Sequence, residues 1–493
     1  TKWRKAFTKP LNDSEAEEVL DLCQQIDRLW EEHTSFRNRI KEQCTDPLSV
    51  WGQPEDHEHH PTSIRDKDRL YDELYLSIQD DGNASPYARL KAVMDYWCAL
   101  WFWPIEKAED LPDRTTFLFQ VRALLGEGVV GQEAKLKGIQ TSMFEDTSLA
   151  PAAETIYQHF GVNGFVNLKQ LRDLFPSLRI ANEVAEQQKF FHWELEFSDV
   201  FEERGGFDLV IGNPPWILLE WNEQAVIGDT QPQYIIKKLS AAETSRIRDT
   251  ALTDSRTRKD YFAEYISIAG QQCFMSAVQN YPLLKGMKTN LFKCFLPQAW
   301  DFGGKSGISA FVHPDGVYDD PNGGLLRTAV YQRLRKHFQF SNEYKLFEGV
   351  HHSTIFSLNI YGGIHVCSFD NIGNLYTVEA IEECYESETE RPVPGIKDMD
   401  GSWNRAGHPH RMIHITKKEL SIFGKVFDDG ASWQESRLPI IHSRELVEVL
   451  TLFSRQSNTI GNNSKDVFGT MCWNETTSQQ NGTTKRKTCF SFY

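Results

Sequence analysis

A ten-residue stretch near the middle of the chain limits its fold more than any other feature. Residues 207–216, FDLVIGNPPW, join an apolar run with two consecutive prolines. The run Phe207–Ile211 predicts a buried strand, and Pro214 and Pro215, which have no N–H, end that strand abruptly. The Asn213 side chain and the neighbouring carbonyl groups can then face a ligand, because ligands bind at the strand ends of open α/β sheets.

Strand-like and helical runs alternate from about residue 191 onward. β-Favouring runs occur at Trp193–Phe197, Gly307–Val312 and Thr354–Tyr361, and helical runs at Tyr261–Met275 and Leu325–His337. This alternation predicts an α/β domain with a largely parallel sheet over residues 191–367. Residues 368–493 are mixed and rich in loops, so we expect them to form a separate region.

The first 190 residues are expected to be mainly helical. Between Asp13 and Glu42 the apolar residues recur at three- and four-residue steps, after the capping-box pattern Ser14-x-x-Glu17. A similar periodicity returns in three later segments: Ile64–Ile78, Tyr87–Trp101 and Thr116–Leu125. A helical segment over residues 1–190 is therefore expected to precede the sheet.

The composition is that of a globular protein with an acidic balance. Lys and Arg total 53 against 69 Asp and Glu, a net charge of −16, which excludes nucleic-acid binding by a wholly basic surface. No apolar run reaches the length of about 18 residues that a membrane span needs, so we expect no membrane association. The nine cysteines form no CxxC pair, which favours reduced thiols, a cytoplasmic location and no bound metal.

The FDLVIGNPPW stretch resembles motif IV, (D/N/S)PP(Y/F/W), of the amino-methyltransferases that use S-adenosylmethionine, and in particular of N6-adenine DNA methyltransferases. The resemblance implies an incomplete class I, Rossmann-like methyltransferase sheet. It also implies that Asn213 and the Pro214 carbonyl accept hydrogen bonds from the target amino group. Pro215 completes the motif, and Trp216 would stack on a base flipped out of the duplex.

Other segments resemble further motifs of the same family, in the family's order. Asp199, in EFSDVF, resembles the motif III residue that accepts a hydrogen bond from the cofactor's adenine; an ordinary loop or cap residue is the alternative. Asp260-Tyr261-Phe262 is similar to the opening of the motif V helix. Phe347, in YKLFEGV, resembles the motif VIII aromatic that covers the other face of the base, and a plain core Phe is the alternative.

The resemblance is closest to the large Eco57I-type restriction-modification and phage-defence methyltransferases, of the BREX or DISARM kind. It implies a site-specific DNA adenine N6-methyltransferase that acts on double-stranded DNA, with other defence subunits as further partners. Residues 191–367 would be the catalytic domain and residues 368–493 the start of a target-recognition region. A non-catalytic DNA-binding scaffold is the rival, and methylation of RNA or of a protein glutamine is a third reading.

The glycine-rich motif I, which holds the methionine end of the cofactor, is absent from the sequence. We therefore expect a fragment of a longer polypeptide, with motif I upstream of Thr1. The sequence Gly126–Gly131 follows a helical run, so we interpret it as a helix stop and turn. Pro112-Asp113 with Glu133-Ala134-Lys135 is interpreted as helix caps rather than a nuclease site, and His57–His60 as a solvated loop rather than a metal site.

Basic residues gather between the Asn213 motif and Asp260. We expect this segment to be a loop that tracks DNA phosphates, and a charged helix face is the equally weighted alternative. The candidates for phosphate contact are Lys237, Lys238, Arg246, Arg248, Arg256 and Arg258. A second basic cluster, Lys485-Arg486-Lys487, lies near the end of the chain.

Overall fold

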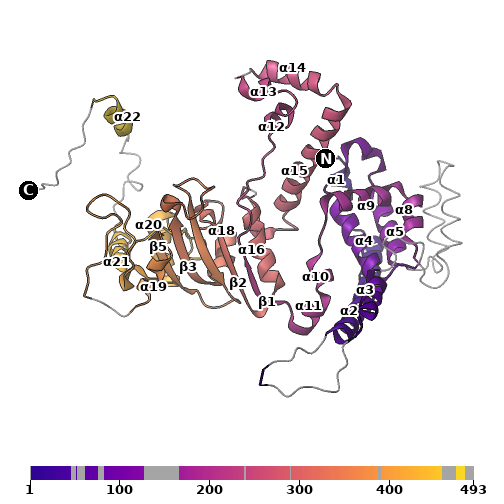
Figure 1. The fold of residues 1–493 in the computed structure, drawn as a ribbon, viewed down its shortest axis with the longest axis horizontal. Coiled ribbons are helices and arrows are strands. Elements are labelled where there is room, and N and C mark those ends of the chain that lie inside the picture. The colour runs from indigo at the N-terminus through magenta and orange to yellow at the C-terminus, as the bar shows by residue number, and fades with distance from the viewer. Residues whose placement is uncertain are drawn as a thin grey trace, which may run out of the picture.

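The computed structural model describes residues 2–45, 51–52, 62–75, 83–126, 166–237, 240–288, 290–386, 390–457 and 474–483. A group of helices from the first part of the chain lies on one side of the molecule, and a six-stranded sheet lies on the other (Figure 1). A helical arm rises between them. None of the described helices is long and apolar enough to cross a membrane.

Every regular element described before residue 190 is helical. Most of these elements share one hydrophobic core, in which Leu29, Tyr96 and Leu171 are buried; the short helices at Lys2–Phe7 and Ile105–Asp110 contribute no buried residue to it. The elements are α1 (Lys2–Phe7), α2 (Asp13–Cys44), α3 (Ile64–Tyr75), α4 (Pro86–Ala99), η1 (Ile105–Asp110), α5 (Arg114–Leu125), α8 (Leu168–Leu174) and α9 (Pro176–Gln188).

The capping box of α2 lies two residues before the predicted one. The Asn12 side chain accepts a hydrogen bond from the Glu15 N–H, and the Glu15 carboxylate accepts one from the Asn12 N–H, both at 2.9 Å. An asparagine serves as N-cap as well as a serine does, so the Ser14-x-x-Glu17 pattern is instead part of the helix.

The strand predicted at Trp193–Phe197 is wrong, because this segment forms two short helices, α10 (Trp193–Glu196) and α11 (Ser198–Arg204). Its alternating apolar residues suit an aromatic cluster instead. Trp193 and Phe197 stack on each other at 5.7 Å, and both contact Phe207 edge to face. Tertiary packing therefore overrides the β-propensity of this segment.

The sheet has the strand order β1-β2-β4-β3-β5-β6. β1 pairs parallel with β2, and β3 with β5, whereas β4 and β6 run antiparallel to their neighbours; β1, β2, β3 and β5 therefore share one direction. The sheet is therefore mixed and not largely parallel as expected, because three of its five strand pairings are antiparallel. Its strands are β1 (Phe207–Gly212), β2 (Gly303–Pro314), β3 (Leu334–Ser341), β4 (Ile355–Tyr361), β5 (Ser368–Leu375) and β6 (Ile413–Thr416).

The strands predicted around Phe207, Gly307 and Thr354 are confirmed as β1, β2 and β4. The helix predicted over Leu325–His337 is confirmed only in its first half, because β3 begins at Leu334. β5 and β6 come from beyond residue 367, so the sheet crosses the expected boundary between the catalytic domain and the next region.

Side chains alternate between two different faces of the sheet. The aromatic face carries Val312, Phe338, Phe340, Phe356 and Leu358, which pack in one cluster. The polar face carries side chains that are buried although they are polar, among them His337 and Asn359. Both faces are covered in the middle of the sheet, as the burial of β3 and β4 shows.

The arm lies between β1 and β2 in the sequence and projects away from the sheet (Figure 1). It has a small core of its own around Ile227, Tyr234 and Tyr261. Its helices are α12 (Glu223–Gly228), α13 (Gln233–Ile236), α14 (Ala241–Ala251) and α15 (Ser255–Ser276).

The remaining helices lie beside the sheet or follow it in the chain. They are η3 (Pro282–Leu284), α16 (Leu291–Phe302), α17 (Gly316–Asp319), α18 (Gly324–Tyr331), η4 (Asn342–Tyr344), α19 (Glu379–Cys384), η5 (Pro409–Arg411), α20 (Lys417–Phe427), α21 (Arg444–Phe453) and α22 (Glu475–Gln480).

Candidate functional site

Asn213 lies where the sequence places it, directly after the last residue of β1. We call the side of the sheet at which β1, β2, β3 and β5 end the carboxyl edge. Asn213 and Pro215 are exposed there, and Pro214 is buried. Among the described residues the Asn213 side chain has no hydrogen-bond partner, so its amide is available to a ligand.

Trp216 is half-buried and tied to the neighbouring strand. Its Nε1–H donates to the Val312 carbonyl at 3.3 Å, and its ring lies against Phe356 at a centroid distance of 5.6 Å. The indole is therefore fixed in orientation, and part of its surface is left open.

The structure brings Phe347 to Trp216, although 131 positions separate them in the sequence. The two rings meet edge to face, with centroids 5.4 Å apart at an angle of 67°. A base held between two parallel rings needs about 7 Å, two stacking steps of about 3.4 Å each. In this arrangement a base can stack on one of the rings, but the rings must separate before it can lie between them.

The loop that carries Phe347 is held by Asn342, which is fully buried. The Asn342 amide donates to the carbonyls of Phe347 and Val350, each at 2.9 Å, and its Oδ1 accepts the Phe347 N–H at 3.0 Å. A buried polar side chain with all of these bonds formed specifies one loop conformation. Asn342 is a residue that the motif comparison missed.

The prediction that β1 is a buried strand is wrong. β1 is an edge strand of the described sheet, with Leu209 59% and Ile211 75% exposed. They lie on the aromatic face beside Ile308, which is 47% exposed. An almost entirely apolar strand is typical of a position covered on both faces, so β1 has less cover here than its sequence predicts.

Asp199 does not follow a strand, although the segment before it was predicted to be one. It lies in the first turn of α11, and its Oδ1 accepts a hydrogen bond from Arg37 Nε at 3.0 Å. Asn38 and Lys41 of α2 reach Glu202 and Glu203 of the same short helix, at 2.9 and 2.6 Å. The Asp199 carboxylate therefore links the front helices to the segment that leads into β1.

The described basic candidates lie on or beside helices, which favours the charged-helix alternative over the expected loop. Arg246 and Arg248 lie on α14, Arg256 and Arg258 on α15, and Lys237 directly after α13; Lys238 lies outside the described residues. Arg248 is paired with Glu223 at 3.5 Å and with Asp249 at 3.3 Å. The side chain of Arg256 is 92% exposed, with Asp260 4.0 Å away.

The expectation that Asp260-Tyr261-Phe262 opens a helix is wrong, because α15 begins at Ser255 with Asp254 as its N-cap. Tyr261 instead belongs to the core of the arm, where its hydroxyl donates to Glu223 at 2.8 Å. Burial, followed by the adjacent Glu223 carboxylate, raises the pKa of Tyr261 to about 12. Tyr261 thus stabilises the arm.

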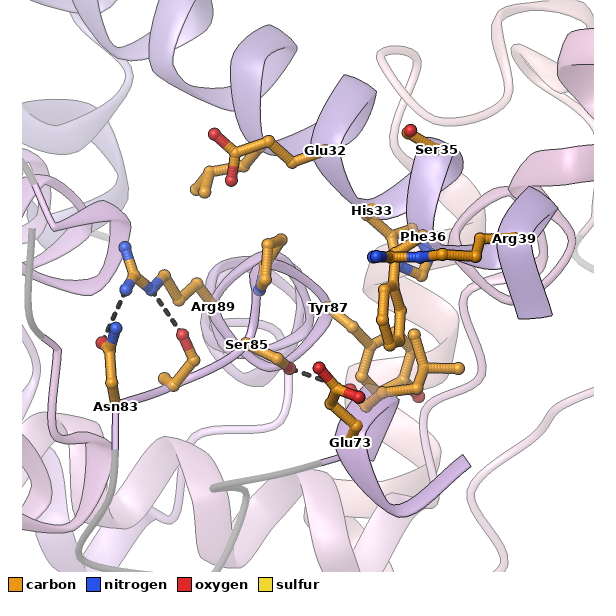
Figure 2. Close-up of a pocket in the computed structure, with 14 residues that line it drawn as sticks. Glu32, His33, Ser35, Phe36, Arg39, Glu73, Asn83, Ser85, Tyr87 and Arg89 are labelled. Atoms are coloured by element: carbon orange, nitrogen blue, oxygen red, sulfur yellow. Dashed lines mark hydrogen bonds between the residues drawn. The ribbon is translucent and has the colours of Figure 1, made fainter. Parts of the chain in front are cut away.

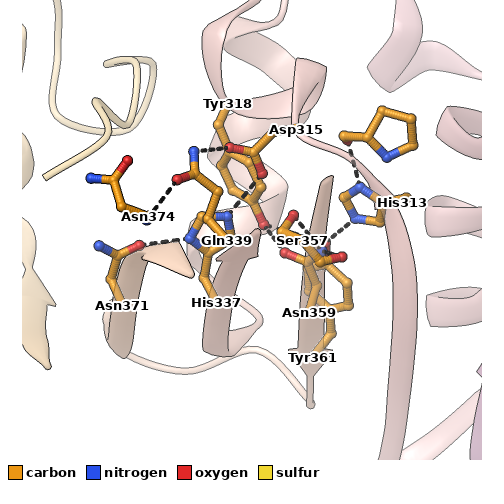
Figure 3. Close-up of polar contacts among 11 residues, drawn as sticks. His313, Asp315, Tyr318, His337, Gln339, Ser357, Asn359, Tyr361, Asn371 and Asn374 are labelled. Carbon is orange, nitrogen blue, oxygen red and sulfur yellow. Dashed lines mark hydrogen bonds and ion pairs between the residues drawn. The ribbon is translucent and has the colours of Figure 1, made fainter. Parts of the chain in front are cut away.

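A buried polar network lies on the polar face of the sheet (Figure 3). Asp315, directly after β2, accepts hydrogen bonds from His337 Nε2 at 3.0 Å and from Gln339 Nε2 at 2.9 Å. Burial acts to raise the pKa of Asp315, but His337 and the hydrogen bonds from Ser357 and Gln339 hold it below its ordinary value. The sequence signal for this network is the polar–apolar alternation of His337–Phe340, which is typical of a half-exposed strand.

The network continues along the same face to a second histidine. Tyr318 donates to Asn359 Oδ1 at 2.6 Å, and His313 Nε2 lies 3.0 Å from the Tyr361 hydroxyl. Burial lowers the pKa of His313 to about 4, so His313 is neutral at physiological pH. We interpret this network as structural, because its described polar groups bond mainly to one another.

A cavity of about 550 Å³ lies among the front helices, between α2, α3 and the start of α4. Glu32, Arg39 and Glu73 stand around it, and Arg89 is held by Asn83 and by the Ala84 carbonyl (Figure 2). None of the residues predicted for the site lines this cavity.

The weaker sequence patterns are resolved in part. Asp113 is the N-cap of α5 and Gly126 its left-handed C-cap, with φ of 81°, which confirms their interpretation as a helix cap and a helix stop. The residues His57–His60, Glu133–Lys135 and Lys485–Lys487 lie outside the described residues. Among the residues that are described, no cluster of three metal-ligating side chains occurs.

One stretch of the chain matches a known family. Residues 77–249 match the model of the Eco57I restriction-modification methylase family. The matched stretch includes Asp199 and Asn213–Trp216 and ends before Phe347. It covers about a third of the chain, so the likeness to restriction-modification methylases is one of that stretch. No curated protein matches the sequence.

Solved structures show only a distant likeness. A complex of DrdV with DNA is 11% identical, with a TM-score of 0.21, and the likeness covers 75% of this chain and 44% of that one. A nuclease-deletion mutant of the Type ISP restriction-modification enzyme LlaGI is 10% identical, with a TM-score of 0.18, over 75% of this chain and 36% of that one. The chain thus spans less than half of either protein, and such TM-scores do not establish a shared fold.

Proposed function

We propose that this protein is a DNA methyltransferase of a restriction-modification or phage-defence system and that it methylates the N6 amino group of adenine in double-stranded DNA. The observation that carries the proposal is the exposed Asn213 at the carboxyl edge, followed three residues later by the fixed ring of Trp216. The match of residues 77–249 to a restriction-modification methylase family supports it.

The proposed role of Asn213 follows from the chemistry of an exocyclic amino group. Such a group has two hydrogens to donate, and the Asn213 side-chain oxygen and the Pro214 carbonyl are the two acceptors of the motif. Accepting both hydrogens pushes the nitrogen toward a tetrahedral geometry and leaves its lone pair aimed away from the acceptors. Trp216 and Phe347 would hold the base, so the contribution of the protein is mainly positioning and removal of water.

S-Adenosylmethionine is the proposed methyl donor, but the described residues do not build a complete site for it. No strand is described before β1, and Gly126 caps a helix. The described residues before β1 therefore contain no glycine-rich turn at the end of a strand. Asp199, the residue proposed for the adenine end, is paired with Arg37. The described residues therefore account for the target side of the reaction and not for the donor side.

Arg256 and Arg258 of the arm are the best placed of the basic candidates for DNA phosphates, because both are exposed near the start of α15. Arg246 and Lys237 are also exposed. Arg248 is a weaker candidate, since Glu223 and Asp249 already neutralise its charge.

The test is the methylation state of the genome in the cells from which the gene comes. Deletion of the gene should remove N6-methyladenine from one sequence motif and leave every other modified base in place. An unchanged DNA methylation pattern would reject the proposal. Loss of a methylated base from RNA, or of methylglutamine from a protein, would instead support the third reading.

A non-catalytic scaffold is the second candidate, and the open edge of β1 favours it. An exposed apolar edge strand is suited to binding another chain. If cells that carry the Asn213→Ala protein are defended as well as cells that carry the parent, that result would favour the scaffold.

A further inference from the structure

The carboxyl edge carries a second group of aromatic side chains, apart from the Asn213 motif. Tyr344 follows β3 and Tyr376 follows β5, and these two strands are parallel neighbours. A hairpin turn, in which Lys397 pairs with Trp403, packs against both rings. Trp403 stacks on Tyr376 at 5.0 Å, and the Tyr344 hydroxyl donates to the Trp403 carbonyl at 3.0 Å.

Two cations are held over these rings. Lys397 Nζ lies 4.1 Å from the centroid of Trp403, and the guanidinium carbon of Arg405 lies 5.6 Å from that of Tyr344. Both residues are exposed. Hydrogen bonds at Glu379 and Thr377, and then the charge of Arg405, lower the pKa of the Glu379 carboxyl, so Arg405 has one acidic neighbour. A cation over an aromatic face loses rotational freedom while its charge stays in water, so it is ordered before a ligand arrives. We call Tyr344, Tyr376, Trp403, Lys397 and Arg405 the platform.

The acidic side chains of the same hairpin are engaged within it. Asp398 accepts a hydrogen bond from the Asn404 amide, and Asp400 accepts one from the Ser402 hydroxyl at 2.7 Å. Their lone pairs are thus partly used inside the turn, whereas Lys397 and Arg405 lie over the rings. Within the hairpin, the two carboxylates therefore lie in the turn and the two cations lie over the rings.

The strand order places the platform at a useful distance from Asn213. Four strand steps separate β1 from β5, which at about 4.8 Å each amounts to roughly 19 Å along the same edge. Stacked base pairs rise about 3.4 Å each, so this span corresponds to five or six base pairs, about half a turn of a duplex.

We propose that the platform binds the phosphate backbone of DNA about half a helical turn from the target base. Lys397 and Arg405 would contact phosphates, and the rings would hold the two cations in position. This inference rests on the proposed function, because it takes DNA as the substrate, and it adds a second point of contact that fixes the register of the duplex.

The test is the salt dependence of DNA binding by the whole chain, measured by fluorescence anisotropy of a labelled duplex of about 24 base pairs over a range of KCl concentrations. The double variant Lys397→Ala, Arg405→Ala should lower the slope of log affinity against log salt by about 1.8, close to 0.9 for each phosphate that is no longer neutralised. The charge-conserving double variant Lys397→Arg, Arg405→Lys should restore most of the slope.

A matched control lies at the opposite edge of the sheet. Lys417, at the start of α20 after the antiparallel strand β6, also lies over a ring, with Nζ 5.9 Å from the centroid of Trp433. The double variant Lys417→Ala, Lys418→Ala removes the same charge there and should leave the slope unchanged.

Equal slopes for the platform and control variants would overturn the inference, as would a parent protein without affinity for DNA or with a preference for RNA of the same length. The proposed function fails separately. If gene deletion leaves DNA methylation unchanged while the platform variant loses slope as stated, the methyltransferase proposal is wrong and the platform remains a DNA contact.

Discussion

At the scale of single residues, the fold uses the two ends of the NPPW motif differently. Asn213 is exposed and has no hydrogen-bond partner among the described residues, whereas Trp216 is bonded to β2 and packed against Phe347 and Phe356. A substitution at Asn213 should therefore affect chemistry alone. A substitution at Trp216 should affect both base binding and local packing.

This difference gives a prediction for the aromatic pair. Trp216→Ala and Phe347→Ala should each weaken binding of DNA that carries 2-aminopurine at the target position by about 1–3 kcal/mol, the range for base stacking on an aromatic ring. Probe fluorescence should also change on flipping, and the Trp216→Ala protein should alter that signal. If the probe behaves identically in the parent and in both variants, neither ring touches the base.

A second prediction concerns the buried pair of Asp315 and His337. The folded pKa of Asp315 lies below its ordinary value of about 3.9, so the pair stabilises the fold above that pH, and the stabilisation is lost as the pH falls through the folded pKa. Asp315→Asn should cost about 3–5 kcal/mol at pH 7, because it leaves a buried histidine without its carboxylate.

The difference in melting temperature between parent and Asp315→Asn should shrink toward zero as the pH falls through the folded pKa of Asp315, which lies below its ordinary value. Asp260→Asn, which removes an exposed carboxylate on α15, is the control and should change little at any pH. A melting difference that is constant with pH would show that Asp315 does not act through its charge.

At the scale of elements, the sequence predicts a strand best where local preference and packing agree. The strands at Phe207 and Gly307 combine β-favouring residues with ordinary sheet pairing, and they were predictable. The segment Trp193–Phe197 has the same local preference, but it is helical, and its aromatic rings pack against Phe207. No local pattern indicates such a contact, since it depends on where β1 lies.

The arm is the element for which DNA contact can be tested most simply. Arg256 and Arg258 are exposed near the start of α15, so the double variant Arg256→Ala, Arg258→Ala should lower the salt slope of DNA binding by about 1 for each phosphate that the arm no longer neutralises. Arg248→Ala should instead lower the stability of the arm, because Arg248 pairs with Glu223 in its core. A normal slope in the double variant would mean that the arm does not contact DNA.

At the scale of the whole molecule, the site draws on parts of the chain that only the fold brings together. Motif resemblance was sufficient to identify Asn213, Trp216 and Phe347 as candidates, and the structure places the two rings in contact. Motif resemblance did not indicate the loop anchor Asn342 or the platform at Trp403, because both depend on the order of β3 and β5 in the sheet.

The missing glycine-rich turn gives a prediction for binding of the methyl donor. Since the described residues supply no glycine-rich turn after a strand, this 493-residue chain should bind S-adenosylmethionine weakly or not at all in a calorimetric titration. Micromolar binding would show that a cofactor loop exists within the chain and would count against the scaffold alternative.

The account depends most on Asn213, and its most direct test is the rate of methyl transfer to DNA by the natural protein purified from its own cells, with tritiated S-adenosylmethionine as donor. Asn213→Ala should slow transfer by on the order of a hundredfold or more, by analogy with the loss of one oriented hydrogen-bonding group in other enzymes, and should leave the affinities for donor and DNA nearly unchanged. Asn222→Ala, which removes the exposed N-cap of α12, is the matched control and should transfer at the parent rate. An Asn213→Ala protein as active as the parent would contradict the central claim that this motif acts on the target amino group.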